Sequence, residues 1–233
     1  MFIYDFDTEL ATGYRWYTTT AYDNDEISHE LHNPIIRGTN PLSPTWEPLH
    51  VIWMDDSDPE YYSGGPSINH ADISHLWNFF GCPLLSQRAV SILRPILNDK
   101  VEFLPLVCDE PNVFVMMKVL NVFDYSEVLD EAKSKIFWSP QTKRMIEAGF
   151  PKEFDSCLSR GSHVLIFKES VVENQLIFKI QQCDTKYTFV TQQFVDIITQ
   201  NNLTGGKFTR VYPPMTEELR QQAYEKAMKK RRN

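Results

Sequence analysis

The sequence predicts an α+β fold with mixed or antiparallel sheets, and two observations carry this prediction. First, residues 86–106 and 191–212 share one pattern: a hydroxyl residue and Gln, apolar residues at helical spacing, a polar turn and an alternating strand. Second, the sequence between the two copies consists mainly of apolar runs typical of strands. We therefore expect two related strand–helix–strand units behind an N-terminal region of strands and loops.

The first residue of each copy is placed to cap a helix. Ser86 and Thr191 each carry a side-chain oxygen that can accept a hydrogen bond from an N–H group of the first helical turn. Pro95 is expected to shorten or kink the first helix. The apolar residues that follow each cap should face the core. They are Ala89, Val90, Ile92 and Leu93 in the first copy, and Phe194, Val195, Ile197 and Ile198 in the second.

The letters TGGK at 204–207 raise the alternative of a phosphate-binding loop. A P-loop follows a strand, precedes a helix, and has Ser or Thr after its Lys. Here the helix comes first and Phe208 follows the Lys. We therefore interpret Gly205 and Gly206 as a helix C-cap and turn that require positive φ, and we expect no nucleotide cofactor.

Apolar patterns predict the other elements. Asp72 is placed as the N-cap of a helix over 72–80, which Gly81 ends, and Thr216 as the N-cap of a C-terminal helix over 216–230. Strands are expected at 14–20, at 50–54, over the long run 113–125, at 187–190, and twice within 162–182, where a polar turn lies near Glu173 and Asn174. The proline-rich stretch 40–50 is typical of a loop.

Charge is distributed unevenly along the chain, whose formal net charge is −8. From Met1 to Phe80 the only Lys or Arg residues are Arg15 and Arg37, against many acids. We expect an acidic, aromatic-rich N-terminal region at 1–80 and a second domain at 81–233, or both as one continuous domain. An acidic face repels nucleic acid and attracts basic partners. The alternative is an ordinary solvated surface.

Several classes of protein and site are not favoured by the sequence. No apolar run is long enough to span a membrane, and the first residues lack the pattern of a signal peptide, so we expect a cytoplasmic protein without a membrane partner. The four cysteines are widely spaced and form no CxxC pair, which argues against a zinc site or a disulfide scaffold. They are Cys82, Cys108, Cys157 and Cys183.

The candidate catalytic and metal-binding patterns in the sequence are incomplete. The acidic run 54–60 lacks the Gly and the later Glu of a calcium-binding EF-hand loop. The His residues at 29 and 32, and at 70 and 75, do not have the spacing of a helical zinc pair. No G-x-S-x-G motif is present, and nothing in the sequence brings Cys157 to His163. We expect no catalytic residue and no metal.

Four stretches, 85–106, 120–135, 163–169 and 189–211, together resemble a bacterial immunity-protein family that was long known only as a domain of unknown function. The most characteristic pieces are VLDEAKS at 128–134 and LTGGKFTRV at 203–211, and the resemblance spans about Leu84 to Val211. Members accompany polymorphic toxins and contact-dependent or secretion-delivered effectors. The resemblance implies stoichiometric neutralisation of a cognate toxin without catalysis. A noncatalytic adaptor or scaffold, and a hydrolase that reverses the toxin's modification, remain as alternatives.

The acidic N-terminal region is the predicted contact with such a toxin, because a toxin that acts on nucleic acid would carry a basic active-site cleft. Trp46 and two tyrosines could supply aromatic anchors. The predicted toxin-binding residues are Asp23, Asp25, Glu26, Asp55, Asp56, Asp58, Glu60, Tyr61 and Tyr62.

Overall fold

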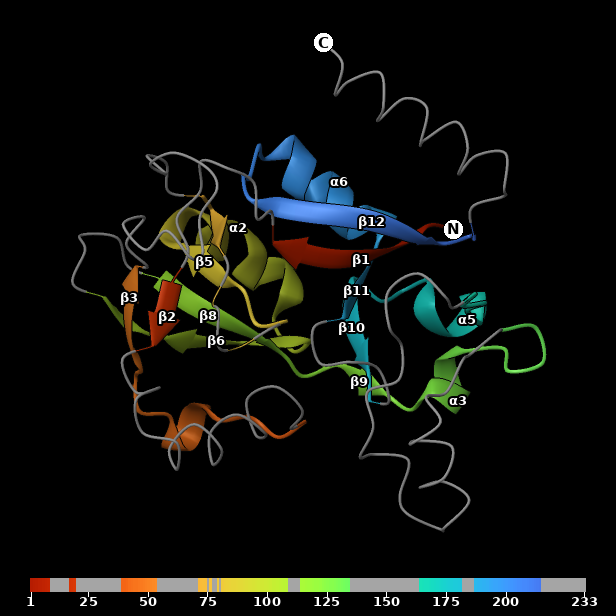
Figure 1. The fold of residues 1–233 in the computed structure, drawn as a ribbon, viewed down its shortest axis with the longest axis horizontal. Helices are drawn as coiled ribbons and strands as arrows, with labels where there is room; N and C mark the ends of the chain where they lie inside the picture. The colour runs from red at the N-terminus through yellow and green to blue at the C-terminus, as the bar shows by residue number, and fades with distance from the viewer. Residues whose placement is uncertain are drawn as a thin grey trace, which may run out of the picture.

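The computed structural model describes residues 1–8, 17–19, 39–53, 71–74, 76, 79, 81–108, 114–134, 164–181 and 187–214. Over these residues the chain forms three small sheets and a few helices, which places it in the α+β class (Figure 1).

The four-stranded sheet is built around one strand that runs antiparallel to both of its neighbours. That strand is β8, and helix α2 (Gln87–Leu97) connects the strands on its two sides, β5 and β6. The strand order is β4 (Ile73–Ser74), β5 (Leu84–Ser86), β8 (Phe114–Val119) and β6 (Val101–Pro105).

The five-stranded sheet contains the same arrangement. Here β1 runs antiparallel to both neighbours, and helix α6 (Gln192–Gln200) connects the strands on its two sides, β11 and β12. The strand order is β12 (Gly206–Tyr212), β1 (Ile3–Thr8), β11 (Thr188–Thr191), β10 (Ile177–Ile180) and β9 (Val122–Phe123).

The remaining elements lie at opposite ends of the molecule (Figure 1). At one end is the three-stranded sheet of β2 (Tyr17–Thr19), β3 (His50–Trp53) and β7 (Val107–Cys108). The short 3-10 helix η2 (Ser43–Thr45) comes before β3 in the chain. At the other end are the short helices α3 (Tyr125–Val128) and α5 (Glu169–Val172).

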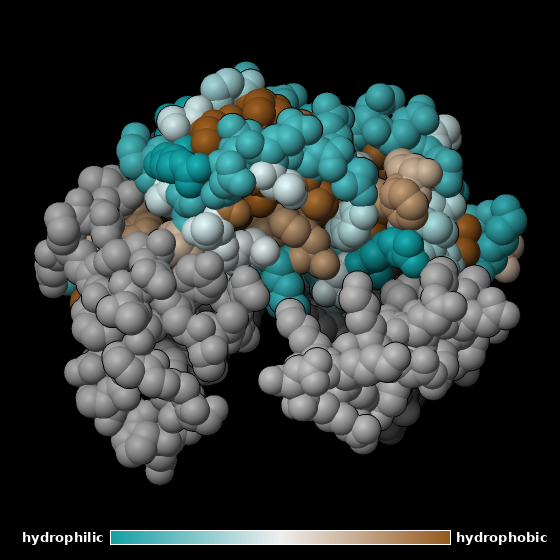
Figure 2. Space-filling view, turned by 90° about the horizontal axis from the view of Figure 1, so that it is seen from above, coloured by the Kyte–Doolittle hydropathy of each residue, from teal (hydrophilic) through white to brown (hydrophobic). Residues whose placement is uncertain are grey.

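One core is shared by the two long helices. Phe194 and Ile198 of α6 pack in the same cluster of buried residues as Val90 and Leu93 of α2, together with side chains from β1, β6, β8, β10 and β11. A second cluster lies under α3 and α5, and a third lies between the four-stranded sheet and β3. Each of the two larger sheets is therefore covered on both faces. Seen from above, the described surface is mainly hydrophilic, with separate hydrophobic patches (Figure 2).

The predicted helical stripes are largely correct. Ala89, Val90 and Leu93 are buried on α2, as are Phe194 and Ile198 on α6. The predicted residues that are only partly buried are Ile92, Val195 and Ile197. Pro95 lies within α2 and does not end it.

The two helices begin in different ways, although both begin after the predicted residue. Ser86 Oγ accepts a hydrogen bond of 3.1 Å from the N–H of Ala89. Thr191 holds the equivalent position before α6, but its side chain makes no capping bond, and its Oγ1 is buried without a hydrogen-bond partner among the described residues. The cap is therefore present at the first helix only.

The end of α6 corrects the interpretation of the two glycines. Asn202 has a φ of 51°, and the N–H groups of Asn202 and Leu203 donate to the carbonyls of Thr199 and Ile198. These two bonds form a Schellman motif, so Asn202 takes the position that we predicted for Gly205. Gly205 does have positive φ, 88°, but it lies in the turn into β12.

The described residues of the stretch 72–80, which are 72–74, 76 and 79, do not form the predicted helix. Ile73 and Ser74 form strand β4, which pairs with β5, and the N–H of Ile73 donates to the carbonyl of Thr204. Ile73 and Leu76, which the helical pattern expected in the core, are nevertheless buried. Pairing with two distant segments therefore overrides the local helical pattern.

Two predicted strand regions also differ from the structure. Residues 113–125 are divided into β8 and β9, because the N–H groups of Leu120 and Asn121 turn to the carbonyl of Lys100. Among the described residues of the region 162–182, which are 164–181, only β10 is a regular strand. The earlier part includes a bridge between Phe167 and Leu129 and then forms α5. That helix buries Val172 in the second core cluster. The C-terminal helix predicted over 216–230 lies outside the described residues.

Candidate functional site

The predicted toxin-binding residues lie outside the described residues. This holds for all nine: Asp23, Asp25, Glu26, Asp55, Asp56, Asp58, Glu60, Tyr61 and Tyr62. Trp46 is described, and its indole Nε1 donates a 2.8 Å hydrogen bond to the carbonyl of Pro105. The indole also packs against the core cluster beneath β3.

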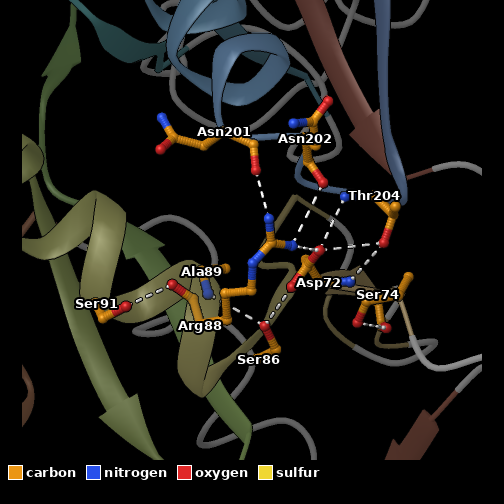
Figure 3. A network of polar contacts seen from close by, with 10 residues as sticks. Asp72, Ser74, Ser86, Arg88, Ala89, Ser91, Asn201, Asn202 and Thr204 are labelled. Carbon is orange, nitrogen blue, oxygen red and sulfur yellow. Dashed lines mark hydrogen bonds and ion pairs between the residues drawn. The ribbon is translucent and has the colours of Figure 1, made fainter.

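The densest polar network in the described part of the chain surrounds Asp72, between the two long helices (Figure 3). One oxygen of its carboxylate accepts a 2.9 Å hydrogen bond from Ser86 Oγ. The other accepts from the N–H of Thr204 at 3.1 Å and from Arg88 Nη1 at 2.7 Å. The backbone N–H of Asp72 donates in turn to Thr204 Oγ1.

Arg88 extends this network to the end of α6. Its guanidinium also donates to the backbone carbonyls of Asn201 and Asn202 (Figure 3). The carboxylate of Asp72 thus lies at the start of α2 and the positive charge of Arg88 at the end of α6, and both placements suit the helix dipoles. These contacts join the two helices to each other and to β4, so the Asp72 network stabilises the fold.

A second polar pair, Glu102 and Lys118, is buried on neighbouring strands of the four-stranded sheet. The two residues are direct partners in the register of β6 and β8, and each is less than a tenth exposed. Glu102 accepts hydrogen bonds from the N–H groups of Leu42 and Ser43 at 2.8 and 2.6 Å. Lys118 Nζ donates to the carbonyl of Asn40 at 2.7 Å. The pair therefore anchors residues 40–43 to the sheet.

The pKa values of this pair reflect its surroundings. Burial raises the pKa of Glu102, but the hydrogen bonds from Leu42 and Ser43 and the charge of Lys118 outweigh it, so the pKa lies below its usual value. Burial lowers the pKa of Lys118, and the charge of Glu102 offsets this only in part. Both groups bind the protein's own backbone, which is a structural role.

The stretch 128–134, which carries much of the resemblance to the immunity-protein family, is a docked turn. The carbonyl of Val128 accepts from the N–H of Lys168, and the N–H of Asp130 donates to the carbonyl of Ile166. Ser134 Oγ accepts from the N–H of Ile166 at 3.0 Å. Asp130 and Lys133 form an ion pair of 2.8 Å. The motif therefore fixes one chain segment against another.

A small pocket lies beside β1, where Asp7, Thr8 and Thr188 meet Gly81 and Cys82. Burial raises the pKa of the Cys82 thiol, and the nearby charges of Lys179 and Lys118 act in the opposite direction. A thiol with a raised pKa is a poor nucleophile. Within the described ranges, no three His, Cys, Asp or Glu residues are grouped so that they could hold a metal ion. Nor does this part of the chain contain a helix that is long and apolar enough to cross a membrane.

Comparison with known proteins identifies the family. The sequence matches the Immunity protein family (Imm11) over residues 46–213, which is well over half of the chain. The chain belongs to the Imm11 immunity protein family. No curated protein matches the sequence. The Imm11 match includes the whole of the resemblance found over Leu84 to Val211, and it begins earlier, before β3. Membership in an immunity protein family implies a cognate toxin as partner.

Proposed function

We propose that this Imm11 protein neutralises a cognate bacterial toxin in the cytoplasm by direct stoichiometric binding, without catalysis. The observation that carries the proposal is the family match over residues 46–213. An immunity protein acts on a toxin made by its own cell or by a neighbour, and a one-to-one complex is the simplest way to block an active site.

The polar groups of the described core are consistent with a binding protein. Asp72 bonds to Ser86, Arg88 and Thr204. Glu102 and Lys118 bond to the backbone of residues 40–43. A general acid or base must reach a substrate proton with its side chain. These buried groups instead bond to residues of the chain itself and hold segments together.

We propose further that the acidic N-terminal region supplies the toxin contact. The support is the sequence bias: Arg15 and Arg37 are the only Lys or Arg residues among the first eighty. Carboxylates on an inhibitor can occupy the place of substrate phosphates in a basic active-site cleft. Asp23, Asp25, Glu26, Asp55, Asp56, Asp58, Glu60, Tyr61 and Tyr62 remain the proposed contact residues.

We also propose that the two strand–helix–strand units are copies of one unit. The support is their register. In the first unit Phe103 lies opposite Met117, and Glu102 opposite Lys118. In the second, Phe208 lies opposite Phe6, and Lys207 opposite Asp7. The acid lies on the strand after the helix in the first unit, and the base lies there in the second. In both units the charged pair directly neighbours the pair that contains Phe103 or Phe208. A crystal structure that shows other partners for Phe103 or Phe208 would contradict this proposal.

Co-expression with the toxin encoded beside this chain's gene tests the proposed function. We expect a one-to-one complex by size-exclusion chromatography with light scattering, loss of toxin activity at equimolar protein, and survival of cells that express both. An immunity protein of another family, expressed at the same level, is the control and should give neither complex nor survival.

Two other outcomes correspond to the alternatives. A complex that leaves the toxin fully active would favour an adaptor or scaffold. Cell survival without a complex, at protein levels far below those of the toxin, would favour a hydrolase that removes the toxin's product or modification. Either result would overturn stoichiometric inhibition.

A further inference from the structure

The three-stranded sheet β2-β3-β7 has one face on the core and one outer face. Val51 is fully buried, and its register partner Cys108 packs against the same core cluster. Because side chains alternate along a strand, His50 and Ile52 lie on the opposite face of β3. Val107 is the register partner of His50 and lies on that face too. The outer face is therefore defined by His50, Ile52 and Val107.

This outer face is more apolar than a solvated sheet face needs to be. Strands β3 and β7 are parallel, and parallel strands are usually buried on both faces. Here Ile52 is 39% exposed and Val107 is 50% exposed, the largest value among the exposed large hydrophobic residues of the described part of the chain. Pro105, two residues before Val107, is also exposed, and its carbonyl accepts the hydrogen bond from Trp46. An exposed apolar patch is a common centre for protein binding.

Both acidic stretches of the N-terminal region are joined directly to this sheet. The chain leaves β2 after Thr19, and Asp23, Asp25 and Glu26 follow. It leaves β3 after Trp53, and Asp55, Asp56, Asp58 and Glu60 follow. Because β2 and β3 are antiparallel, with Tyr17 opposite Trp53 and Thr19 opposite Val51, the two exits lie at opposite ends of the sheet. Strands this short separate their ends by roughly 10 Å at ~3.3 Å per residue.

We propose that the outer face of β2-β3-β7 is the docking surface for the toxin, and that the toxin presents an apolar contact there, bordered by basic side chains. This inference rests on the proposed function and adds the location and chemistry of the contact. Charge complementarity argues for a basic partner, since the two acidic stretches leave the sheet on either side of the patch. Apolar contacts at the centre would supply most of the affinity, and the charges would govern approach.

Substitution of the patch tests the location. The double variant Ile52→Thr/Val107→Thr keeps the β-branched side chains that strands favour and removes apolar contact area. We expect this variant to unfold like the wild type and to bind the co-expressed toxin at least about tenfold more weakly, a loss typical of important interface residues. Ile96→Thr is the matched control, because Ile96 is 40% exposed on α2. It should bind like the wild type.

Photo-crosslinking gives a second measurement that does not depend on affinity. A photoreactive amino acid in place of Val107 should crosslink to the toxin, and one in place of Ile96 should not. The docking surface would be overturned if the wild type forms a complex, both substituted variants bind the toxin as tightly as the wild type does, and position 107 gives no crosslink. The proposed function would then remain intact. Absence of any complex with the wild-type protein would overturn both.

Discussion

Arg88 Nη1 lies 2.7 Å from Asp72 Oδ2, and this ion pair joins the first turn of α2 to the residue before β4. The same guanidinium donates to the carbonyls of Asn201 and Asn202, directly after α6. The partners differ in exposure: the Asp72 side chain is 12% exposed and the Arg88 side chain 52%. The pair itself is therefore partly screened by solvent. Most of the stabilisation should come from the other hydrogen bonds of the Asp72 carboxylate, because their donors would otherwise be left unsatisfied near the core.

We expect Asp72→Ala to lower the free energy of unfolding by about 2 to 4 kcal/mol, because it leaves Ser86 Oγ and the N–H of Thr204 without their acceptor. Urea denaturation followed by circular dichroism measures this. Asp196→Ala is the control, since Asp196 is exposed on α6 and accepts a hydrogen bond from Gln192. Its cost should stay below about 0.5 kcal/mol. Equal costs for the two variants would show that the network does not stabilise the fold.

The unequal caps of the two long helices give a second prediction. Ser86→Ala should cost about 1 to 2 kcal/mol, since it removes the bond to the N–H of Ala89 and the bond to Asp72. Thr191→Val should be neutral or stabilising, because it replaces a buried hydroxyl that has no partner among the described residues with a methyl group of similar size. Chemical denaturation measures the change in the free energy of unfolding for both variants. A larger cost for Thr191→Val than for Ser86→Ala would show that the Thr191 hydroxyl caps α6.

The two glycines before β12 should respond differently to a Cβ atom. A Cβ on Gly205 would lie 2.0 Å from the carbonyl oxygen of Ile73 and 2.6 Å from Ala71 Cβ, and the residue has a φ of 88°. We expect Gly205→Ala to cost about 2 to 4 kcal/mol, from backbone strain and overpacking together.

Gly206→Ala is the neighbouring comparison. Its Cβ would lie 3.3 Å from side-chain atoms of Ile73 and Phe208, which can move, so we expect a cost of about 1 kcal/mol or less. Thermal unfolding of both variants measures the difference. Binding of ATP or GTP by the wild type, lost in Gly205→Ala, would instead restore the phosphate-loop interpretation.

Glu102 gives a pH-dependent prediction. Its folded pKa lies below the usual value, so its contribution to stability is complete above the unfolded pKa of about 4.3 and is lost as the pH falls through the folded value. Glu102→Gln should therefore be less stable than the wild type at pH 7, and the gap should narrow as the pH falls from about 5 to 3. Urea denaturation across this range measures it. A gap independent of pH would mean that the Glu102 charge does not stabilise the fold.

The sequence predicts the long helices because their periodicity and their burial agree. Val90 and Leu93 on α2, and Phe194 and Ile198 on α6, satisfy a helical pattern that local residues alone define. The stretch 72–80 satisfies the same pattern, yet Ile73 and Ser74 form β4, because β5 and the backbone of Thr204 supply pairing partners from distant parts of the chain. Local periodicity contains no information about such partners.

The polar networks were missed for a similar reason, although one signal was present. Glu102 and Lys118 each interrupt an otherwise apolar strand, and a charged residue in a buried strand usually requires a partner. Two such interruptions of opposite sign therefore indicate a buried pair. The Asp72 network carried no comparable signal, because its members come from three segments that only the tertiary fold brings together.

The proposed acidic contact gives the last prediction. Changing Asp55, Asp56 and Asp58 together to Asn removes three negative charges from the stretch that follows β3 and preserves side-chain size. Opposite charges steer diffusional encounter, and salt screens them within about 10 Å at 0.1 M. We therefore expect slower association of the triple variant with the toxin at low salt, and a weaker decline of its association rate as salt rises. Stopped-flow fluorescence measures both rates.

A variant with Glu127, Glu131 and Glu173 changed to Gln is the matched control, because these exposed acids lie near α3 and α5, at the other end of the molecule. It removes the same charge from the whole protein, so any effect of net charge alone would appear in both variants. Slower association in the first variant only would locate the steering charges beside β3. Equal effects, or unchanged protection of cells and unchanged rates in the first variant, would place the toxin contact away from the acidic N-terminal region.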